Sequence, residues 1–176
     1  MLANRTIRDV LIAITAAILL LSFSAYYLAH PSEVEDPGVA IAPEVLCRMN
    51  KMVVSSGTEA LQLVKQSHTG SIEYVKDVAI MHYIKEHGML TLWTTQYPNE
   101  TIANNETEKM VLGMRNWGGS WASNLKEITV AGKQVYQTTP DGESYHYFWV
   151  DGNWVFYIIP HNLSQDEVAE CIAAIP

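Results

Sequence analysis

The sequence has few of the residues that make up recognisable reaction centres. It contains 2 cysteines and 6 histidines in 176 residues, and none of them has the spacing of a zinc-binding or redox motif. The glycine patterns of nucleophile elbows, phosphate loops and dinucleotide-binding turns are also missing. The sequence therefore predicts a protein that is not an enzyme, with no catalytic residue, no metal site and no cofactor.

Basic residues are scarce as well. The chain has 11 Lys and Arg against 19 Asp and Glu, which gives a formal net charge of -8. No stretch of the chain clusters Lys and Arg. Because nucleic acids and anionic lipid surfaces are bound through clustered positive charge, the composition argues against nucleic acid as a partner.

One long apolar run lies near the N-terminus. Residues 10–29 carry no charge, and at about 1.5 Å per residue they are long enough to cross the ~30 Å hydrocarbon core of a bilayer as a helix. Arg5 and Arg8 precede the run and acidic residues follow it, so the positive-inside rule places the N-terminus in the cytoplasm. A cleaved signal peptide is the alternative. We predict a single-pass protein of the cell membrane with a cytoplasmic N-terminus at 1–9, a transmembrane signal anchor at 10–29, an extended linker at 30–43 and an extracytoplasmic domain at 44–176.

The stretch richest in apolar area is 143–160, where aromatic and β-branched residues flank Asp151-Gly152. Asp-Gly between such runs is a strong signal for a two-residue hairpin turn. With these two residues in the turn, Trp149 faces Trp154 on the neighbouring strand. Both faces of this hairpin are apolar, so both are expected to be covered.

The remaining periodicity predicts an α+β fold. Helices are expected over 44–56, 58–68 and 106–117, and hairpins over 71–97 and 126–139. Asn105 is the expected N-cap of the third helix, and a capping box from Ser164 to Glu167 begins a last one. We predict that the N-terminal transmembrane helix is followed by one antiparallel β-sheet with the helices packed on one face.

The aromatic hairpin is also the best candidate for recognition. Tyr and Trp offer a large amphipathic area at low entropy cost, which suits a protein interface, a sugar or an apolar ligand. The alternative is that these side chains form the core between the sheet and the helices. The candidate binding face consists of Tyr145, Tyr147, Trp149, Trp154 and Phe156.

Two kinds of covalent modification are predicted for the extracytoplasmic domain. Cys47 and Cys171 lie on the first and last predicted helices, and disulfides persist outside the cytosol, so we predict a bridge between them. The alternative is a pair of buried thiols. Asn99, Asn105 and Asn162 begin Asn-x-Ser/Thr sequons and predict glycosylation, although helix capping also explains Asn105.

The C-terminal third carries a family resemblance. Residues 132–136 (GKQVY), residues 147–157 (YFWVDGNWVFY) and the final helix resemble the ends of membrane-anchored extracytoplasmic domains related to lipoprotein-localisation proteins and anti-sigma regulators. The resemblance implies a curved antiparallel sheet that holds an acyl chain or senses a partner. We predict a single-pass, membrane-anchored binding, sensing or accessory domain that meets a protein partner. The alternative is a carrier or sensor of an apolar or lipid-like ligand held between the aromatic sheet face and the helices.

Overall fold

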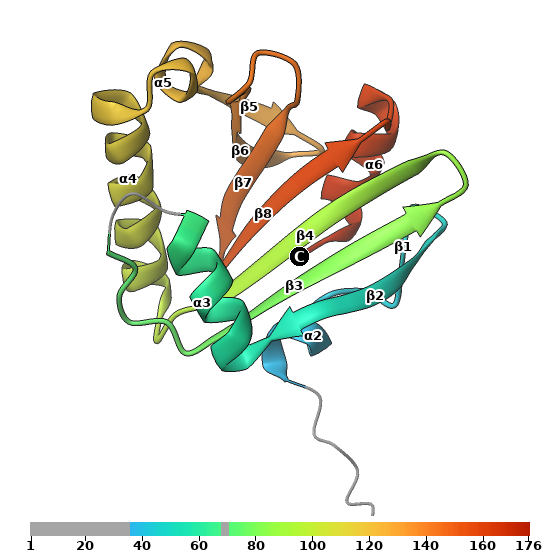
Figure 1. The fold of residues 1–176 in the computed structure, drawn as a ribbon, viewed down its shortest axis with the longest axis horizontal. Helices are drawn as coiled ribbons and strands as arrows, with labels where there is room; N and C mark the ends of the chain where they lie inside the picture. The colour runs from blue at the N-terminus through green and yellow to red at the C-terminus, as the bar shows by residue number, and fades with distance from the viewer. Residues whose placement is uncertain (1–35, 68–70) are drawn as a thin grey trace, which may run out of the picture. The chain divides into compact units, whose positions relative to one another are not determined.

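The computed structural model describes residues 36–67 and 71–176, and Figure 1 shows their fold. The predicted cytoplasmic segment 1–9, the predicted transmembrane segment 10–29 and the linker as far as residue 35 lie outside the described residues. Within the described ranges, no helix is both long enough and apolar enough to span a membrane. These ranges form mostly an eight-stranded antiparallel sheet, which five helices accompany.

The sheet is built from two meanders of four strands that meet in its middle. Its strand order is β1-β2-β3-β4-β8-β7-β6-β5, so β4 pairs with β8 although some sixty residues of chain separate them. Every neighbouring pair is antiparallel. The strands are β1 (Val45–Leu46), β2 (Met49–Ser56), β3 (Asp77–Lys85), β4 (Gly88–Gln96), β5 (Lys126–Val130), β6 (Lys133–Thr138), β7 (His146–Asp151) and β8 (Trp154–His161).

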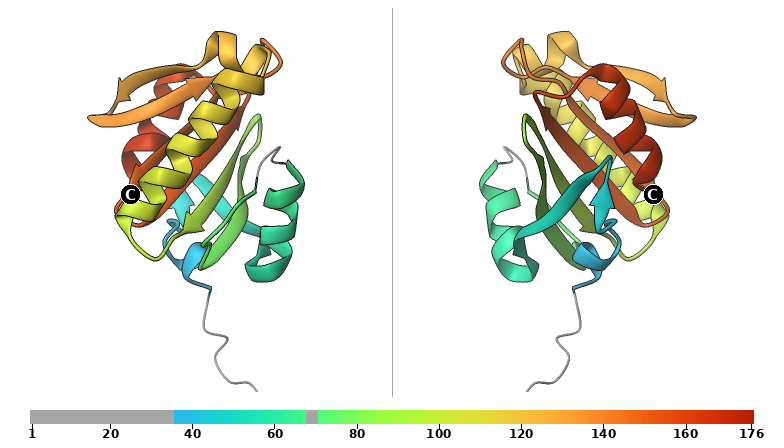
Figure 2. Two further views of the ribbon diagram at one scale, coloured as in Figure 1. Left: turned by 90° about the vertical axis from the view of Figure 1, so that its left-hand side faces the viewer. Right: turned by 90° about the vertical axis from the view of Figure 1, so that its right-hand side faces the viewer.

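The helices lie on both faces of this sheet. The inner face, which carries Met81 and Ile158, packs against α6 (Gln165–Ala174) in the main core. The outer face packs against α3 (Gly57–Ser67) through Ile80 and against α4 (Glu100–Trp117) through Val155. Figure 2 shows α6 and α4 on opposite sides of the β7–β8 hairpin.

The predicted fold class is therefore corrected on the placement of the helices, which do not gather on one face. The described residues contain no membrane-spanning helix, and the predicted span at 10–29 lies outside them. The placement of helices on both faces has a physical cause, because the β7–β8 hairpin is apolar on both sides. A sheet with two apolar faces is covered on both of them, since uncovered apolar area costs free energy in water.

The predicted helix over 44–56 is wrong, because this segment forms β1 and β2. Its apolar residues recur at near-helical spacing, which produced the prediction. The segment instead turns at Cys47 and Arg48, both of which have positive φ, and β2 then pairs with β3 along most of its length. Long-range pairing has overridden a short local pattern.

The described end of the predicted linker is part of the domain. Residues 37–40 form α2 (Pro37–Ala40), and Val39 belongs to the main core. The ammonium group of Lys51 donates hydrogen bonds to the carbonyl oxygens of Val39 at 3.1 Å and of Ala42 at 3.4 Å. The side chain of Thr94 donates to the carbonyl oxygen of Gly38 at 2.6 Å. These bonds hold the segment against the sheet.

The other predicted elements are present, and one of them begins earlier than predicted. The helix predicted over 58–68 is confirmed as α3, and the hairpin over 71–97 is confirmed as β3 and β4. The third predicted helix starts earlier than expected, because Asn99 rather than Asn105 is the N-cap of α4 and accepts a hydrogen bond from the Ile102 backbone at 3.0 Å. The last helix has the predicted capping box. A five-residue helix, α5 (Ser120–Asn124), follows α4.

The aromatic hairpin is confirmed, with its turn moved by one residue. Gly152 and Asn153 form the turn, so that Asp151 pairs with Trp154 and Trp149 pairs with Phe156. Gly152 has φ +55°, as the first position of a type II′ turn requires. Each residue of β7 therefore pairs with a residue two positions later in β8 than predicted. Because side chains alternate between the two faces of a sheet, every side chain stays on its predicted face.

Replacing Gly152 tests this turn. Gly152→Val is expected to lower the free energy of unfolding by about 1–3 kcal/mol, because a β-branched residue is strained at positive φ. No atom lies within 4 Å of the position a Cβ would take, so the loss should come from the backbone alone. Gly152→Asn, which tolerates positive φ better, is the matched control. Urea unfolding of both variants measures the difference, and equal stability of Val and Asn would contradict the turn assignment.

Candidate functional site

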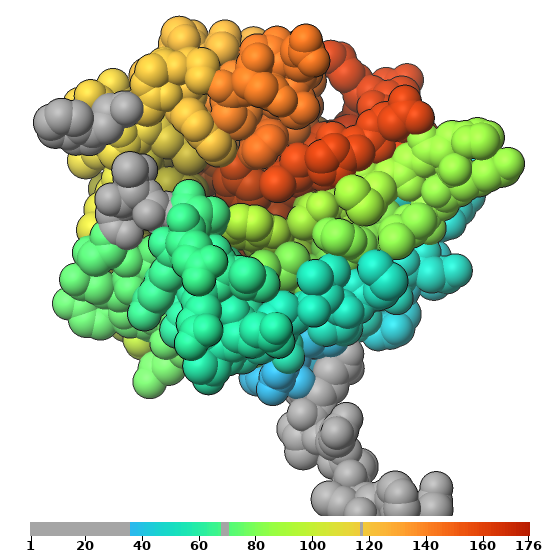
Figure 3. All heavy atoms as spheres, viewed as in Figure 1, coloured from blue at the N-terminus to red at the C-terminus, as the bar shows by residue number. Residues whose placement is uncertain are grey.

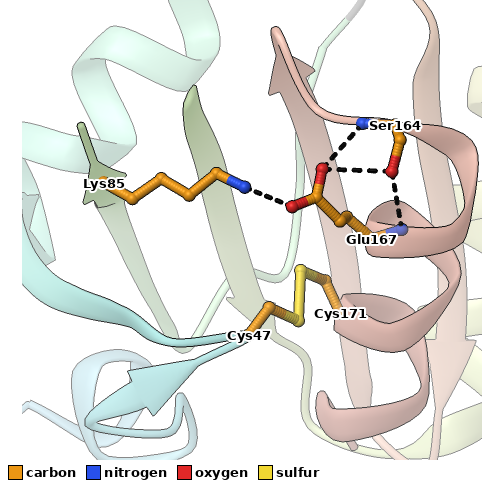
Figure 4. Close-up of a disulfide and its surroundings, with 5 residues drawn as sticks. All are labelled: Cys47, Lys85, Ser164, Glu167 and Cys171. Carbon is orange, nitrogen blue, oxygen red and sulfur yellow. Dashed lines mark hydrogen bonds and ion pairs between the residues drawn. A yellow bond between two sulfur atoms is a disulfide. The ribbon is translucent and has the colours of Figure 1, made fainter. Parts of the chain in front are cut away.

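The first turn of α6 is bonded to the end of β3. Ser164 caps the helix and accepts a hydrogen bond from the Glu167 backbone at 3.3 Å, while the Glu167 carboxylate accepts one from the Ser164 backbone at 3.0 Å. The same carboxylate forms an ion pair with Lys85 at the end of β3 (Figure 4). Hydrogen bonds from Lys85 and Ser164 lower the pKa of Glu167 to about 2. The carboxylate therefore stays charged and holds Lys85 across the pH range in which proteins are normally handled.

The middle of α6 is joined covalently to the β1–β2 turn. Cys47 and Cys171 form the predicted disulfide, with their Cα atoms 5.5 Å apart (Figure 4). At the end of the helix, the Trp149 indole N–H donates to the carbonyl oxygen of Pro176 at 3.0 Å, and Lys133 donates to that of Ile175. The helix is thus held at its start, middle and end. Its buried apolar stripe consists of Val168, Cys171 and Ile172, and Ile175 continues it just beyond the helix.

The structure divides the predicted binding face into a core and an exposed part. Trp149 is 1% exposed, Phe156 0% and Tyr147 5%, and all three pack in the main core with α6. Trp154 is partly buried and packs against that core. Tyr145 is 40% exposed. Of these five side chains, that of Tyr145 is the one classed as exposed.

A cleft opens at the Tyr145 end of the inner face, beside the start of α6. Its volume is about 250 Å³. Tyr145 and Tyr147 both line it, with ring centroids 6.3 Å apart and ring planes inclined by 34°. We call it the Tyr145 cleft, and its lining residues are Glu143, Ser144, Tyr145, Tyr147, Pro160, His161, Asn162, Leu163, Gln165 and Val168.

Two fixed structures set the shape of the Tyr145 cleft. The Tyr147 hydroxyl accepts a hydrogen bond from the Gln137 side chain at 3.0 Å, and burial raises the pKa of this tyrosine, so the ring is held and neutral. The carboxylate of Asp141 accepts hydrogen bonds from the backbone of Glu143 at 2.9 Å and of Ser144 at 2.7 Å. These bonds lower the pKa of Asp141 to about 2. These hydrogen bonds fix the conformation of the loop that carries Glu143.

Several polar side chains of the cleft have unused hydrogen-bonding capacity. Among the described residues, no hydrogen bond engages the side chains of Glu143, Tyr145 or Gln165. The Asn162 amide donates to the carbonyl oxygen of His87, which leaves its own oxygen as an acceptor. Sequence reasoning missed this group because its members come from loops that only the paired β7 and β8 bring together. The sequence Pro140-Asp141-Gly142, which is typical of a turn, is the local signal that lies closest to this group.

The three sequon asparagines are exposed at different kinds of position. Asn99 is the N-cap of α4, and its side-chain oxygen already accepts a backbone hydrogen bond. Asn105 lies inside α4, and the hydroxyl of its sequon partner Thr107 is buried. Asn162 follows β8 with φ +55° and donates to His87. Glycosylation of these residues stays a prediction.

Aromatic rings also cross the outer face of the sheet, which Figure 3 shows as a shallow hollow over β8 with α4 on one side and α3 on the other. The rings of Tyr157, Phe148 and Tyr136 stack in sequence across neighbouring strands, and the Trp93 ring lies beside that of Tyr157, with centroids 5.5 Å apart and planes inclined by 32°. His146 lies 2.5 Å from the Tyr157 hydroxyl, and burial lowers the pKa of this histidine. Because the rings face one another, they offer edges rather than open faces to a ligand.

The described histidines do not build a metal site. His82 lies on β3 and His146 on β7, so β4 and β8 separate them. No group of three or more His, Cys, Asp or Glu side chains within residues 36–67 and 71–176 is placed to hold a metal ion.

The β1–β2 edge carries four exposed apolar side chains. Val45 is 58% exposed, and the others, between 45% and 48%, are Met52, Val53 and Val54. β1 pairs with β2 through only two residues, which leaves much of this edge uncovered. A bulge between Val53 and Ser55 interrupts β2. Bulges of this kind hinder the addition of another strand to a sheet edge.

No protein-family model, curated protein or solved structure matches this chain. The resemblance of the C-terminal third stays a prediction.

Proposed function

We propose that this chain is a membrane-anchored extracytoplasmic binding domain, and that the Tyr145 cleft is its binding site. The observation that carries the proposal is the division of the aromatic hairpin. The other rings of the predicted binding face are in or against the main core, whereas Tyr145 projects to the surface beside unengaged polar side chains. A cleft that combines an exposed aromatic ring with a few convergent polar groups is typical of a recognition site.

The compartment is supported by the covalent chemistry of the domain. The bridge between Cys47 and Cys171 is of the kind that persists in oxidising surroundings and is rare in the cytosol. The apolar segment 10–29 suits an anchor that holds the domain at the outer side of a membrane. The proposal assigns the domain no catalytic step.

We rank the carriage of an apolar ligand second. Such a ligand would lie between the aromatic sheet face and α6, where Trp149, Phe156 and Ile172 are at most 1% exposed and pack together. To admit an acyl chain, α6 would have to leave the sheet. That movement would break the Lys85–Glu167 ion pair and be restrained by the disulfide.

Site-specific photo-crosslinking tests the proposal. The full-length protein is made with p-benzoylphenylalanine in place of Tyr145 and irradiated in its native membrane. We expect discrete adducts from position 145. The matched control carries the same group at Tyr74, which is 62% exposed and far along the chain from the cleft. Indistinguishable labelling at the two positions would overturn the assignment of the site.

A further inference from the structure

We propose that the Tyr145 cleft binds a neutral sugar ring. This inference rests on the proposed function and names the ligand class of the same site. Three properties of the cleft support it: its hydrogen-bonding groups, its exposed aromatic ring and its size.

The hydrogen-bonding groups of the cleft match a polyol. Each sugar hydroxyl both donates and accepts, so a site for it needs both kinds of partner. The Glu143 carboxylate only accepts, whereas the Gln165 amide and the Tyr145 hydroxyl each donate and accept. The free oxygen of Asn162 adds another acceptor. The set is mixed, as a ring with several hydroxyls requires.

The charge of the cleft argues against the main polar rivals. No Lys or Arg lines it, so a phosphate or sulfate would lack the cationic partners that usually bind it, and the imidazole of His161 is the one basic side chain in the lining. One carboxylate lines it, that of Glu143. An organic cation is bound through acceptors and aromatic faces, so it would leave donor groups such as the Gln165 amide without a partner.

The apolar part of the cleft suits the C–H face of a sugar. Tyr145 is 40% exposed and offers a ring that is partly free of protein contacts, and Leu163 and Val168 complete an apolar wall. Tyr presents an apolar ring and a polar hydroxyl together. A sugar ring has the same dual character, with C–H groups on its faces and hydroxyls around its edge.

The size of the cleft selects a single ring. Its volume of about 250 Å³ lies below the range of roughly 300–1,000 Å³ found for drug-sized ligands. A long acyl chain would extend beyond it and leave the polar side chains desolvated without partners, which is costly. One pyranose ring, at the end or along the side of a glycan, matches the space.

Saturation-transfer NMR on the full-length, disulfide-intact protein in nanodiscs tests the proposal. The probes are the methyl glycosides of glucose, mannose, galactose and N-acetylglucosamine, each at millimolar concentration. We expect at least one glycoside to bind, with the strongest transfer to its ring C–H protons. Tyr145→Ala should weaken binding at least about fivefold, the equivalent of roughly 1 kcal/mol. Tyr145→Phe should retain most of it, and Glu143→Gln and Gln165→Ala should each weaken it.

The controls separate a built site from surface adsorption. Tyr74→Ala removes another exposed tyrosine and should leave binding unchanged, and cyclohexanol, a ring with one hydroxyl, should not bind. The proposal is overturned if none of the four glycosides binds, if Tyr145→Ala has no effect, or if cyclohexanol or choline binds as well as the best glycoside. Adducts from position 145 that contain a protein but no carbohydrate would overturn the sugar assignment and leave the binding domain standing.

Discussion

Cys171→Ser is expected to lower the free energy of unfolding by about 2–5 kcal/mol. The bridge spans a sequence separation of 124, and cross-linking so long a loop restricts the unfolded chain strongly. The same bond holds the middle of α6 against the inner face of the sheet. Its loss should therefore destabilise that helix more than the rest of the domain, so that backbone amides 168–174 exchange faster than those of β3 and β4.

Urea unfolding and amide hydrogen exchange measure both parts of this prediction. Cys47→Ser and the double variant should each match Cys171→Ser, because all three lack the same bond. Wild-type protein treated with a dithiol reductant should approach them. A loss well below 1 kcal/mol, or uniform exchange across α6 and the central strands, would contradict the role given to the disulfide.

Trp149→Ala is expected to lower the free energy of unfolding by about 3–5 kcal/mol. Trp149 is 1% exposed and stacks on Phe156 with ring centroids 5.4 Å apart. Its indole N–H donates to the carbonyl oxygen of Pro176 at 3.0 Å, and the Lys133 ammonium lies 5.7 Å from its ring centroid. The substitution removes core volume and the contact that holds the C-terminus.

Two variants divide this loss into its parts. Trp149→Phe keeps an aromatic ring but removes the bond to Pro176, so it should cost less than Trp149→Ala. Trp154→Ala removes a partly buried tryptophan from the same hairpin face and should also cost less. Equal losses for Trp149→Ala and Trp154→Ala in urea unfolding would contradict the placement of Trp149 in the core.

Local signals predicted the elements whose residues determine their own conformation. Asp151-Gly152 predicted the hairpin, although the turn formed one residue later because Gly152 takes the first turn position. Ser164 and Glu167 predicted the start of α6, because a capping box is made within four residues. The disulfide was predicted from cysteine count and compartment, even though Cys47 lies in a turn and not on a helix.

The wrong predictions concern elements whose structure depends on residues that are far away in the chain. The segment 44–56 has an ambiguous pattern, and its strands exist because β3 is available to pair with β2. The start of α4 at Asn99 depended on a cap that competes with Asn105 six residues later, and both are good N-cap residues. The placement of helices on both faces followed from the whole sheet.

The candidate site shows the same division. The aromatic composition of 145–156 predicted that recognition and core packing compete for the same side chains. Which ring serves which purpose depends on where α6 lies, because α6 covers Trp149 and Phe156 and leaves Tyr145 exposed. Sequence spacing did not predict that the polar residues Glu143, Asn162 and Gln165 lie together. Glu143 precedes β7, whereas Asn162 and Gln165 follow β8.

The amino-acid sequence by itself determined the hairpins and the cap of the last helix, because hydrophobic period, turn residues and capping residues act over a few positions. It also determined the disulfide, because the chain has only two cysteines to pair. Only the tertiary structure decided the central pairing of β4 with β8, the faces that the helices cover and the Tyr145 cleft. These features depend on contacts between residues far apart in the chain. Such contacts form where burial of apolar area offsets the loss of chain entropy.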